Sequence, residues 1–151
     1  ALPPQALLVI MGVGRLESKL KALVQSLEIE DRVVFTGQVP DARQYFKAFD
    51  VFALTSDHEP FGMVLLEAMA AGNALICSDC GGGPEVVGDI GCLFPFGDAT
   101  SLAATLLRCA GYDAEQLAML GQQANERLTL LFSDTAAQRR FWQLPVTAPY
   151  K

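Results

Sequence analysis

The sequence is short of basic residues, which restricts the ligands that it can attract. Its 11 Lys and Arg residues are outnumbered by 17 Asp and Glu residues, giving a net charge of −6 at pH 7 and a pI near 4.6. Proteins that attract nucleic acid or anionic lipid electrostatically carry a basic patch. The composition therefore argues against a nucleic-acid partner and against strong attraction to a membrane surface.

Long apolar runs are lacking as well. No stretch approaches the roughly 20 apolar residues that span a bilayer, and no basic segment followed by an apolar one opens the sequence in the manner of a signal peptide. We therefore expect a cytoplasmic location.

Cysteine and histidine are too sparse for a zinc site. Cys77 and Cys80 have the C-x-x-C spacing of redox pairs and of half a zinc site. A second pair is lacking, because Cys92 and Cys109 lie far apart in the sequence and His58 is the only histidine. We expect no metal, and we interpret the cysteines as buried structural thiols in a reducing cytoplasm.

Internal repeats and low-complexity segments are also absent, and the 151 residues, 51% of them hydrophobic, suffice for one domain spanning residues 1–151. Short apolar runs alternate with helical patterns, as in a parallel sheet covered on both faces. The predicted strands are residues 6–11, 33–36, 51–55, 74–78 and 92–95. The predicted helical segments are residues 15–27, 41–48, 60–71, 84–87, 98–110, 114–131 and 133–143, with Asp98 and Ser133 as N-caps. This alternation predicts an α/β fold with an open, doubly wound parallel sheet, whose ligand lies beyond the carboxyl ends of the strands.

Two carboxylates separated by seven residues follow the third predicted strand, in the segment from Glu59 to Glu67. Pro60 suits the first position of a helix, and Gly72 suits its end. If a helix begins at Pro60, Glu59 lies just before its first turn and Glu67 about two turns along it, so the two residues are roughly 12 Å apart along the axis. The first turn then offers free N–H groups and a favourable dipole to a phosphate, while the carboxylates accept hydrogen bonds from sugar hydroxyls. The alternative is that both acids only complement the helix dipole or face solvent.

Glycine-rich segments give two further candidates for phosphate binding. Gly12 and Gly14 follow a predicted strand, but Glu17 replaces the third glycine of a dinucleotide fingerprint, so a tight turn explains them as well. The run from Gly81 to Gly83 either cradles phosphate or simply connects a strand to a helix, and the residues alone leave both interpretations open.

Several motifs in order resemble one known family over most of the chain. They are LLVIMGVG, RVVFTGQVP, FDVFALTS, SDHEPFGMVLLEAMAAGNALICSDCGGGPEVV and GCLFPFGDATSLAATL. The sequence is similar to the C-terminal, donor-binding domain of retaining glycosyltransferases of the family 4 type, which consist of two Rossmann-like domains (the GT-B fold). The resemblance implies a nucleotide-sugar donor such as a UDP- or GDP-sugar as substrate, and no cofactor.

The resemblance also implies roles for individual residues. Glu59 would be the catalytic residue, whose carboxylate binds the hydroxyls of the transferred sugar, and Glu67 would bind the ribose. Backbone N–H groups of Phe61, Gly62, Met63 and Val64 face the sugar and diphosphate, Val39 contacts the base through its main chain, and Gly82 lies near the donor.

One part of the family pattern is lacking. Such domains begin with a strand and a glycine-rich loop that carry an arginine and a lysine, whereas this sequence opens at what corresponds to the second strand. The lacking strand belongs at the centre of the sheet, so we expect a gap, a rearranged sheet, or strand exchange with a partner or dimer. Without the cationic pair and the N-terminal acceptor domain, the isolated chain is expected to be inactive.

The resemblance therefore predicts an enzyme that transfers a hexose or a related sugar to a glycan, lipid or other hydroxyl acceptor, with peripheral membrane association through the parent enzyme. Two alternatives remain open: a sugar-nucleotide epimerase, and a nucleotide-binding or interaction module without catalysis.

Overall fold

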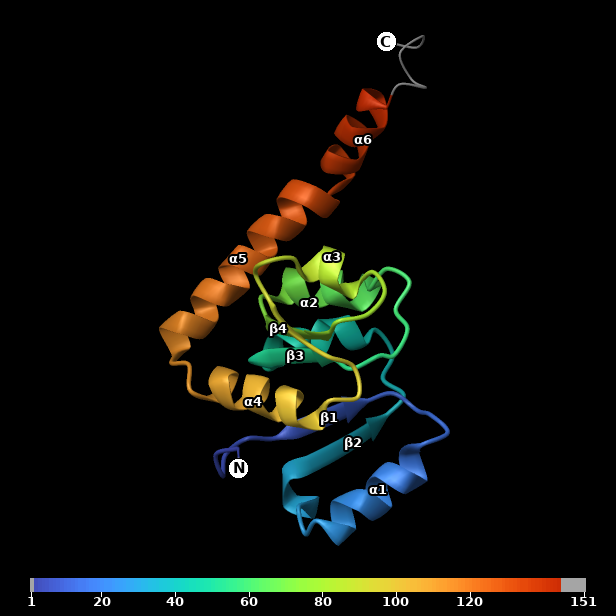
Figure 1. Ribbon diagram of the computed structural model, residues 1–151, viewed down its shortest axis with the longest axis vertical. Coiled ribbons are helices and arrows are strands. Elements are labelled where there is room, and N and C mark those ends of the chain that lie inside the picture. The colour runs from blue at the N-terminus through green and yellow to red at the C-terminus, as the bar shows by residue number, and fades with distance from the viewer. Residues whose placement is uncertain (1, 145–151) are drawn as a thin grey trace. The chain divides into compact units, whose positions relative to one another are not determined.

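The computed structural model describes residues 2–144. They belong to two compact units, which divide between Gln44 and Tyr45. The described strands all pair in parallel and alternate with helices, which confirms the predicted α/β class. No helix in residues 2–144 is both long enough and apolar enough to cross a membrane. Each unit is described by itself below (Figure 1).

The first unit consists of a parallel pair of strands joined by a helix. Strand β1 (Leu8–Met11) pairs with β2 (Val33–Gly37), with α1 (Glu17–Ser26) and the short 3-10 helix η1 (Glu30–Arg32) between them. The pairing runs from Leu8 opposite Val33 and becomes irregular after Ile10. This arrangement agrees with the predicted strand–helix–strand order.

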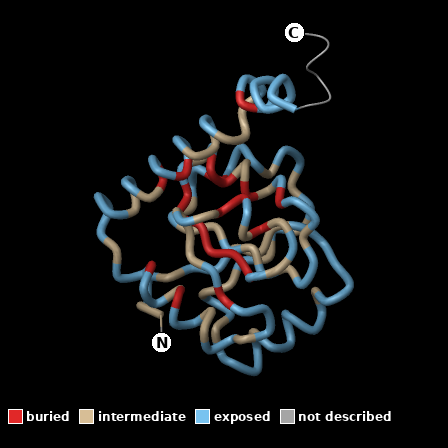
Figure 2. The backbone as a smooth tube through the Cα atoms, turned by 45° about the horizontal axis from the view of Figure 1, so that its top comes forward, coloured by how far each residue is buried: buried red, intermediate tan, exposed pale blue. Residues whose placement is uncertain are grey.

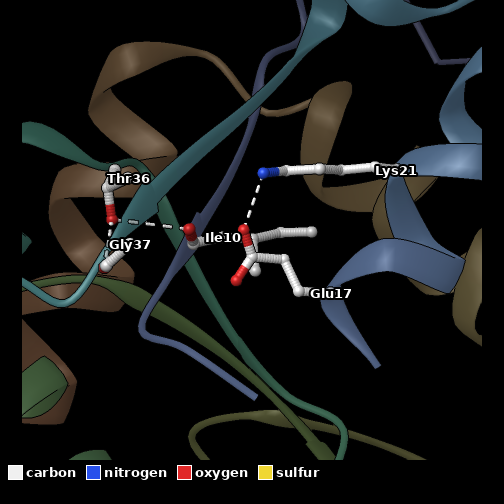
Figure 3. Close-up of polar contacts among 5 residues, drawn as sticks. All are labelled: Ile10, Glu17, Lys21, Thr36 and Gly37. Carbon is white, nitrogen blue, oxygen red and sulfur yellow. Dashed lines mark hydrogen bonds and ion pairs between the residues drawn. The ribbon is translucent and has the colours of Figure 1, made fainter. Parts of the chain in front are cut away.

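Polar contacts hold the parts of this first unit together (Figure 3). Lys21 on α1 pairs with Glu17 one turn earlier at 2.6 Å, and its ammonium lies 5.4 Å from the centre of the Phe35 ring on β2. The Thr36 hydroxyl donates to the Gly37 carbonyl at 3.0 Å and reaches the Ile10 carbonyl at 3.5 Å. No residue from 2 to 44 is fully buried, so this unit has little apolar core of its own.

The second unit has a three-stranded parallel sheet in the order β3 (Val51–Leu54), β4 (Ala74–Ser78) and β5 (Cys92–Phe94). Every residue of the central strand β4 is buried, as expected for an apolar strand with neighbours on both edges. Buried residues gather in the interior of this unit (Figure 2). The core of the chain therefore lies around β4.

Helices cover both faces of this sheet (Figure 1). Helices α2 (Met63–Ala71) and α3 (Gly83–Val87) lie on one face, and α4 (Ala99–Ala110) lies on the other. Ile76 and Phe94 form a buried cluster with Cys109 of α4, whereas Cys77 points to the opposite face, towards Gly83 of α3. The alternation of side chains along β4 thus supplies both layers.

Two further helices follow, α5 (Ala114–Phe132) and α6 (Asp134–Gln143). Asp98 caps α4 by accepting from two backbone N–H groups, and Ser133 caps α6, as predicted. Asp113 and Gln116 form a capping box at the start of α5. Helix α5 packs against α2 so closely that a Cβ on Gly121 would lie 2.2 Å from the Gly72 carbonyl oxygen.

Three features differ in detail from the sequence prediction. The described strands form two sheets, β1–β2 and β3–β4–β5, and not one continuous sheet. Residues 42–48 form a 3-10 helix, η2 (Ala42–Ala48). The predicted start of a helix at Pro60 is wrong, because α2 begins at Met63 after Gly62 adopts a left-handed backbone with φ of 94°.

Candidate functional site

The candidate site lies in the second unit, at the carboxyl ends of β3 and β4, where the fold class places ligands. The loop after β3 and the loop after β4 are joined there by hydrogen bonds. The Ser56 carbonyl accepts from the Ser78 hydroxyl at 2.6 Å and from the Cys80 thiol at 2.9 Å. The Glu59 carbonyl accepts from the Gly82 N–H at 2.7 Å. These bonds fix the backbone on which the predicted ligand-binding residues stand.

Close packing of this kind requires glycine in the second loop. A Cβ on Gly81 would lie 2.1 Å from the Glu59 carbonyl oxygen, and a Cβ on Gly82 would lie 2.6 Å from the Pro60 carbonyl oxygen. Both distances are far below van der Waals contact, so no side chain fits at either position. The glycine run is therefore a tightly packed contact and not a loose connection between a strand and a helix.

Glu59 is partly buried and is oriented by the chain itself. Its Oε1 accepts a hydrogen bond of 2.9 Å from the Gly62 N–H, three residues along. Because α2 begins at Met63, Glu59 lies in the loop before the helix, and the axial separation from Glu67 that we predicted for a helix from Pro60 does not apply. No partner of Oε2 is found among the described residues.

The first turn of α2 has free hydrogen-bond donors. The Leu65 N–H donates to the Gly62 carbonyl, but in the described part of the chain the N–H groups of Met63 and Val64 have no acceptor. The positive end of the helix dipole lies at the same place. This turn can therefore bind an anion such as a phosphate.

The side chains along α2 differ in exposure. Met63 is 63% exposed, and Phe61 is 43% exposed with its ring edge-on to Phe132 at 6.1 Å between centroids. Glu67 is partly buried, and within residues 2–144 its carboxylate has no hydrogen bond or ion pair. Glu67 is thus available to a ligand, although partial exposure also lets water solvate it.

Most of the predicted site residues come together in this unit. Glu59, Phe61, Gly62, Met63, Val64, Glu67 and Gly82 all belong to the two loops and to α2. Val39 belongs to the first unit, where it follows β2, so its contact with a base remains a prediction. His58 is exposed, and nothing in the geometry gives it a chemical role.

Cys77 lies close to this site but is not a reactive group. Burial, helped by the nearby Cys80, Glu59 and Asp79, raises its pKa to about 11. The thiol is therefore protonated at neutral pH and serves as packing. The described residues contain no group of three or more His, Cys, Asp or Glu side chains arranged to hold a metal.

Sequence reasoning missed the residues that join the two loops. The bonds from Ser78 and Cys80 to Ser56 connect residues more than 20 positions apart, and nothing in the local pattern marks them. The available signal was the glycine run, since consecutive glycines after a strand often mark a close approach of backbone.

Together, the fold and the site define a Rossmann-like α/β domain in which a helix begins with free backbone N–H groups and has a carboxylate on either side along the chain. The family comparison identifies the family directly: the chain belongs to the family described as "Glycosyl transferases group 1", whose model matches residues 1–127.

Two curated relatives illustrate the similarity. The chain is 38% identical over 123 residues to N-acetyl-alpha-D-glucosaminyl L-malate synthase of Bacillus anthracis, a match that covers 80% of this chain and 32% of the relative. It is 31% identical over 149 residues to the lipopolysaccharide core biosynthesis glycosyltransferase LpsE of Rhizobium meliloti, covering 97% of this chain and 43% of the relative. The chain thus spans less than half the length of either.

Solved structures agree with this assignment. Anabaena HepE in complex with UDP matches with a TM-score of 0.80 and 28% identity, over 93% of this chain and 40% of that chain. Sucrose-phosphate synthase from Thermosynechococcus elongatus matches with a TM-score of 0.79 and 32% identity, over 93% of this chain and 38% of that chain. The fold is therefore that of the Rossmann-like GT-B glycosyltransferases.

Proposed function

We propose that this chain is the donor-binding part of a retaining glycosyltransferase of the family 4 type, which transfers a hexose or related sugar from a nucleotide-activated donor to a hydroxyl acceptor. The observation that carries the proposal is the start of α2, where the N–H groups of Met63 and Val64 are free and Glu59 and Glu67 lie on either side along the chain. HepE, with which the chain shares its fold, has been crystallised with UDP.

In the proposed complex each group has one task. The diphosphate accepts hydrogen bonds from the first turn of α2, where the dipole also favours it. Glu67 accepts from the ribose, and the free oxygen of Glu59 accepts from the transferred sugar. Hydroxyl groups are well matched to ionised carboxylates, because carboxylates only accept and charge-assisted hydrogen bonds are strong.

In the reaction, the acceptor hydroxyl attacks on the face from which the nucleoside diphosphate leaves, so that the configuration is retained. Stabilisation of the departing diphosphate by preorganised donors supplies much of the rate. We further propose that acceptor recognition lies outside this chain, which would then bind donor without transferring sugar. Measurable transfer by the chain alone would contradict this.

Calorimetric titration with UDP, GDP and their sugar conjugates tests the donor site. Glu67→Gln should weaken binding of the preferred nucleoside diphosphate by about 10- to 100-fold, because a hydrogen bond to a charged group contributes about 1.5–3 kcal/mol. Glu59→Gln should leave the nucleoside diphosphate unaffected and weaken only the nucleotide sugar. Glu115→Gln, at an exposed position in the first turn of α5, is the matched control and should change neither.

The same titration separates the alternatives. If no nucleotide binds to the folded chain, the site does not bind a donor, and an interaction module becomes the better interpretation. If a nucleotide sugar binds and the intact protein inverts a sugar carbon without any acceptor, the protein is a sugar-nucleotide epimerase.

A further inference from the structure

A second group of reactive side chains lies at the other end of the three-stranded sheet. A pocket of about 250 Å³ opens where β4 and β5 begin, and Cys92, Cys109, Arg108, Asp89 and Tyr112 are among its lining residues. The candidate donor site lies where β3 and β4 end. Because the strands are parallel, this pocket lies at the amino ends of the strands and the candidate donor site lies at their carboxyl ends.

Cys92 has a cation in direct contact. The Arg108 guanidinium donates to the Cys92 sulfur at 2.8 Å, and this hydrogen bond raises the pKa of Arg108. A guanidinium at this distance stabilises negative charge on sulfur, which is the form of cysteine that reacts with electrophiles. Asp89, the acid of the same pocket, pairs instead with Arg127 at 3.7 Å.

Cys109 supplies a second thiol next to the first. It is 3% exposed and packs with Cys92 in the cluster around Ile76 and Phe94. Burial, with a smaller contribution from the nearby Cys92, raises the pKa of Cys109 to about 11. Cys109 is therefore a protonated partner held beside a thiol that faces a guanidinium.

The other two cysteines differ in this respect. Cys77 is buried against Gly83, and Cys80 donates to the Ser56 carbonyl. Among the described residues, Cys92 is the one cysteine with a hydrogen bond to a cationic side chain. The chemistry therefore centres on Cys92 and not on the C-x-x-C pair that the sequence singles out.

We propose that Cys92 and Cys109 form a peroxide-reactive dithiol, in which Cys92 is the attacking thiol and Cys109 the resolving one. The Cys92 thiolate attacks one oxygen of a hydroperoxide, an S–O bond forms, the O–O bond breaks and hydroxide or alkoxide leaves. The sulfur loses two electrons to the peroxide and becomes a sulfenic acid. The Cys109 sulfur then attacks the Cys92 sulfur, a disulfide forms, and the Cys109 proton leaves with the hydroxyl group as water.

The test treats the intact protein with hydrogen peroxide, blocks the remaining thiols with iodoacetamide and maps the peptides by mass spectrometry. The expected product is a disulfide between Cys92 and Cys109 that dithiothreitol reverses. Cys92→Ser should abolish it. Cys109→Ala should leave a sulfenic acid at Cys92 that dimedone captures.

The role of the guanidinium is tested by the rate. Arg108→Gln should slow alkylation of Cys92 at neutral pH by about fivefold, the factor that corresponds to about 1 kcal/mol for an exposed charge interaction. Arg139→Gln, an exposed arginine on α6, is the matched control and should leave the rate unchanged. The proposal is overturned if Cys92 is oxidised no faster than Cys80, or if Cys109 remains a free thiol after Cys92 has been oxidised.

Discussion

Replacing Gly81 by alanine tests whether backbone contact between the two loops builds the candidate donor site. Gly81 has a φ of 57°, and a Cβ there would lie 2.1 Å from the Glu59 carbonyl oxygen. A left-handed backbone costs a residue with a Cβ about 1–2 kcal/mol. Forcing an extra carbon into a packed contact costs about 1–3 kcal/mol more. We therefore expect Gly81→Ala to lower the free energy of unfolding by about 2–5 kcal/mol, a large part of a domain's total of about 5–15 kcal/mol.

Two other glycines separate the two causes. Gly97 has a φ of 80° but no atom within 4 Å of its Cβ position, so Gly97→Ala should cost only the backbone strain, about 1–2 kcal/mol. At Gly82 a Cβ would lie 2.6 Å from the Pro60 carbonyl oxygen without a left-handed backbone, so Gly82→Ala should cost only the overlap, about 1–3 kcal/mol. Urea unfolding, monitored by circular dichroism, gives the free energy of unfolding of all three variants, and an unchanged m-value shows that only stability differs. If Gly81→Ala costs no more than Gly97→Ala, the loops are not in the contact described, and the argument for a fixed Glu59 fails.

Three other changes have definite expected signs. Gly121→Ala should destabilise the chain by up to about 2 kcal/mol, because its Cβ would lie 2.2 Å from the Gly72 carbonyl oxygen. This is the net effect after the gain of about 1 kcal/mol from the higher helix propensity of alanine. A raised urea midpoint would contradict this packing. Arg127→Met should lower the free energy of unfolding, measured by calorimetry, by about 2–4 kcal/mol, because the guanidinium donates to two carbonyl groups of α3 at 2.8 and 2.9 Å. Arg127→Lys should recover only part of this stability. Hydrogen bonds from the Ser101 side chain and backbone lower the pKa of Asp98 below its ordinary 3.8, so its contribution to stability is present above that value and is lost as pH falls through the folded-state pKa. The difference in urea midpoint between the wild type and Asp98→Ala at pH 7 should therefore shrink as the pH falls below 3.8.

The strands and most helices could be predicted because they depend on short-range patterns. Each of the five predicted apolar runs agrees with a strand to within two residues at either end, and β4 coincides with its prediction. The caps at Asp98 and Ser133 were equally visible, because a short polar side chain before a helical pattern favours an N-cap. The Asp113–Gln116 capping box carries a similar signal.

The start of α2 could not be predicted in the same way, because two local signals conflict there. Pro60 favours the first helical position, while Gly62 permits the left-handed backbone that prevents a helix from starting so early. The outcome depends on Gly82, which binds the Glu59 carbonyl from a loop about 20 positions away. A contact of that kind leaves no mark on the residues between Glu59 and Gly62, so the geometry of this turn could not be read from the local sequence.

This geometry gives Glu59 two tasks that use different atoms. Its Oε1 accepts from the Gly62 N–H and so fixes the turn before α2, which leaves the Met63 and Val64 amides free at the start of the helix. Its Oε2 has no partner in the described part of the chain and remains available to a hydroxyl group. The carboxylate is thus held in place before any ligand arrives, so little conformational entropy is lost on binding. In the proposed complex, this scaffold would fix where the sugar and the diphosphate meet, and contacts beyond these backbone atoms would select the sugar and the base.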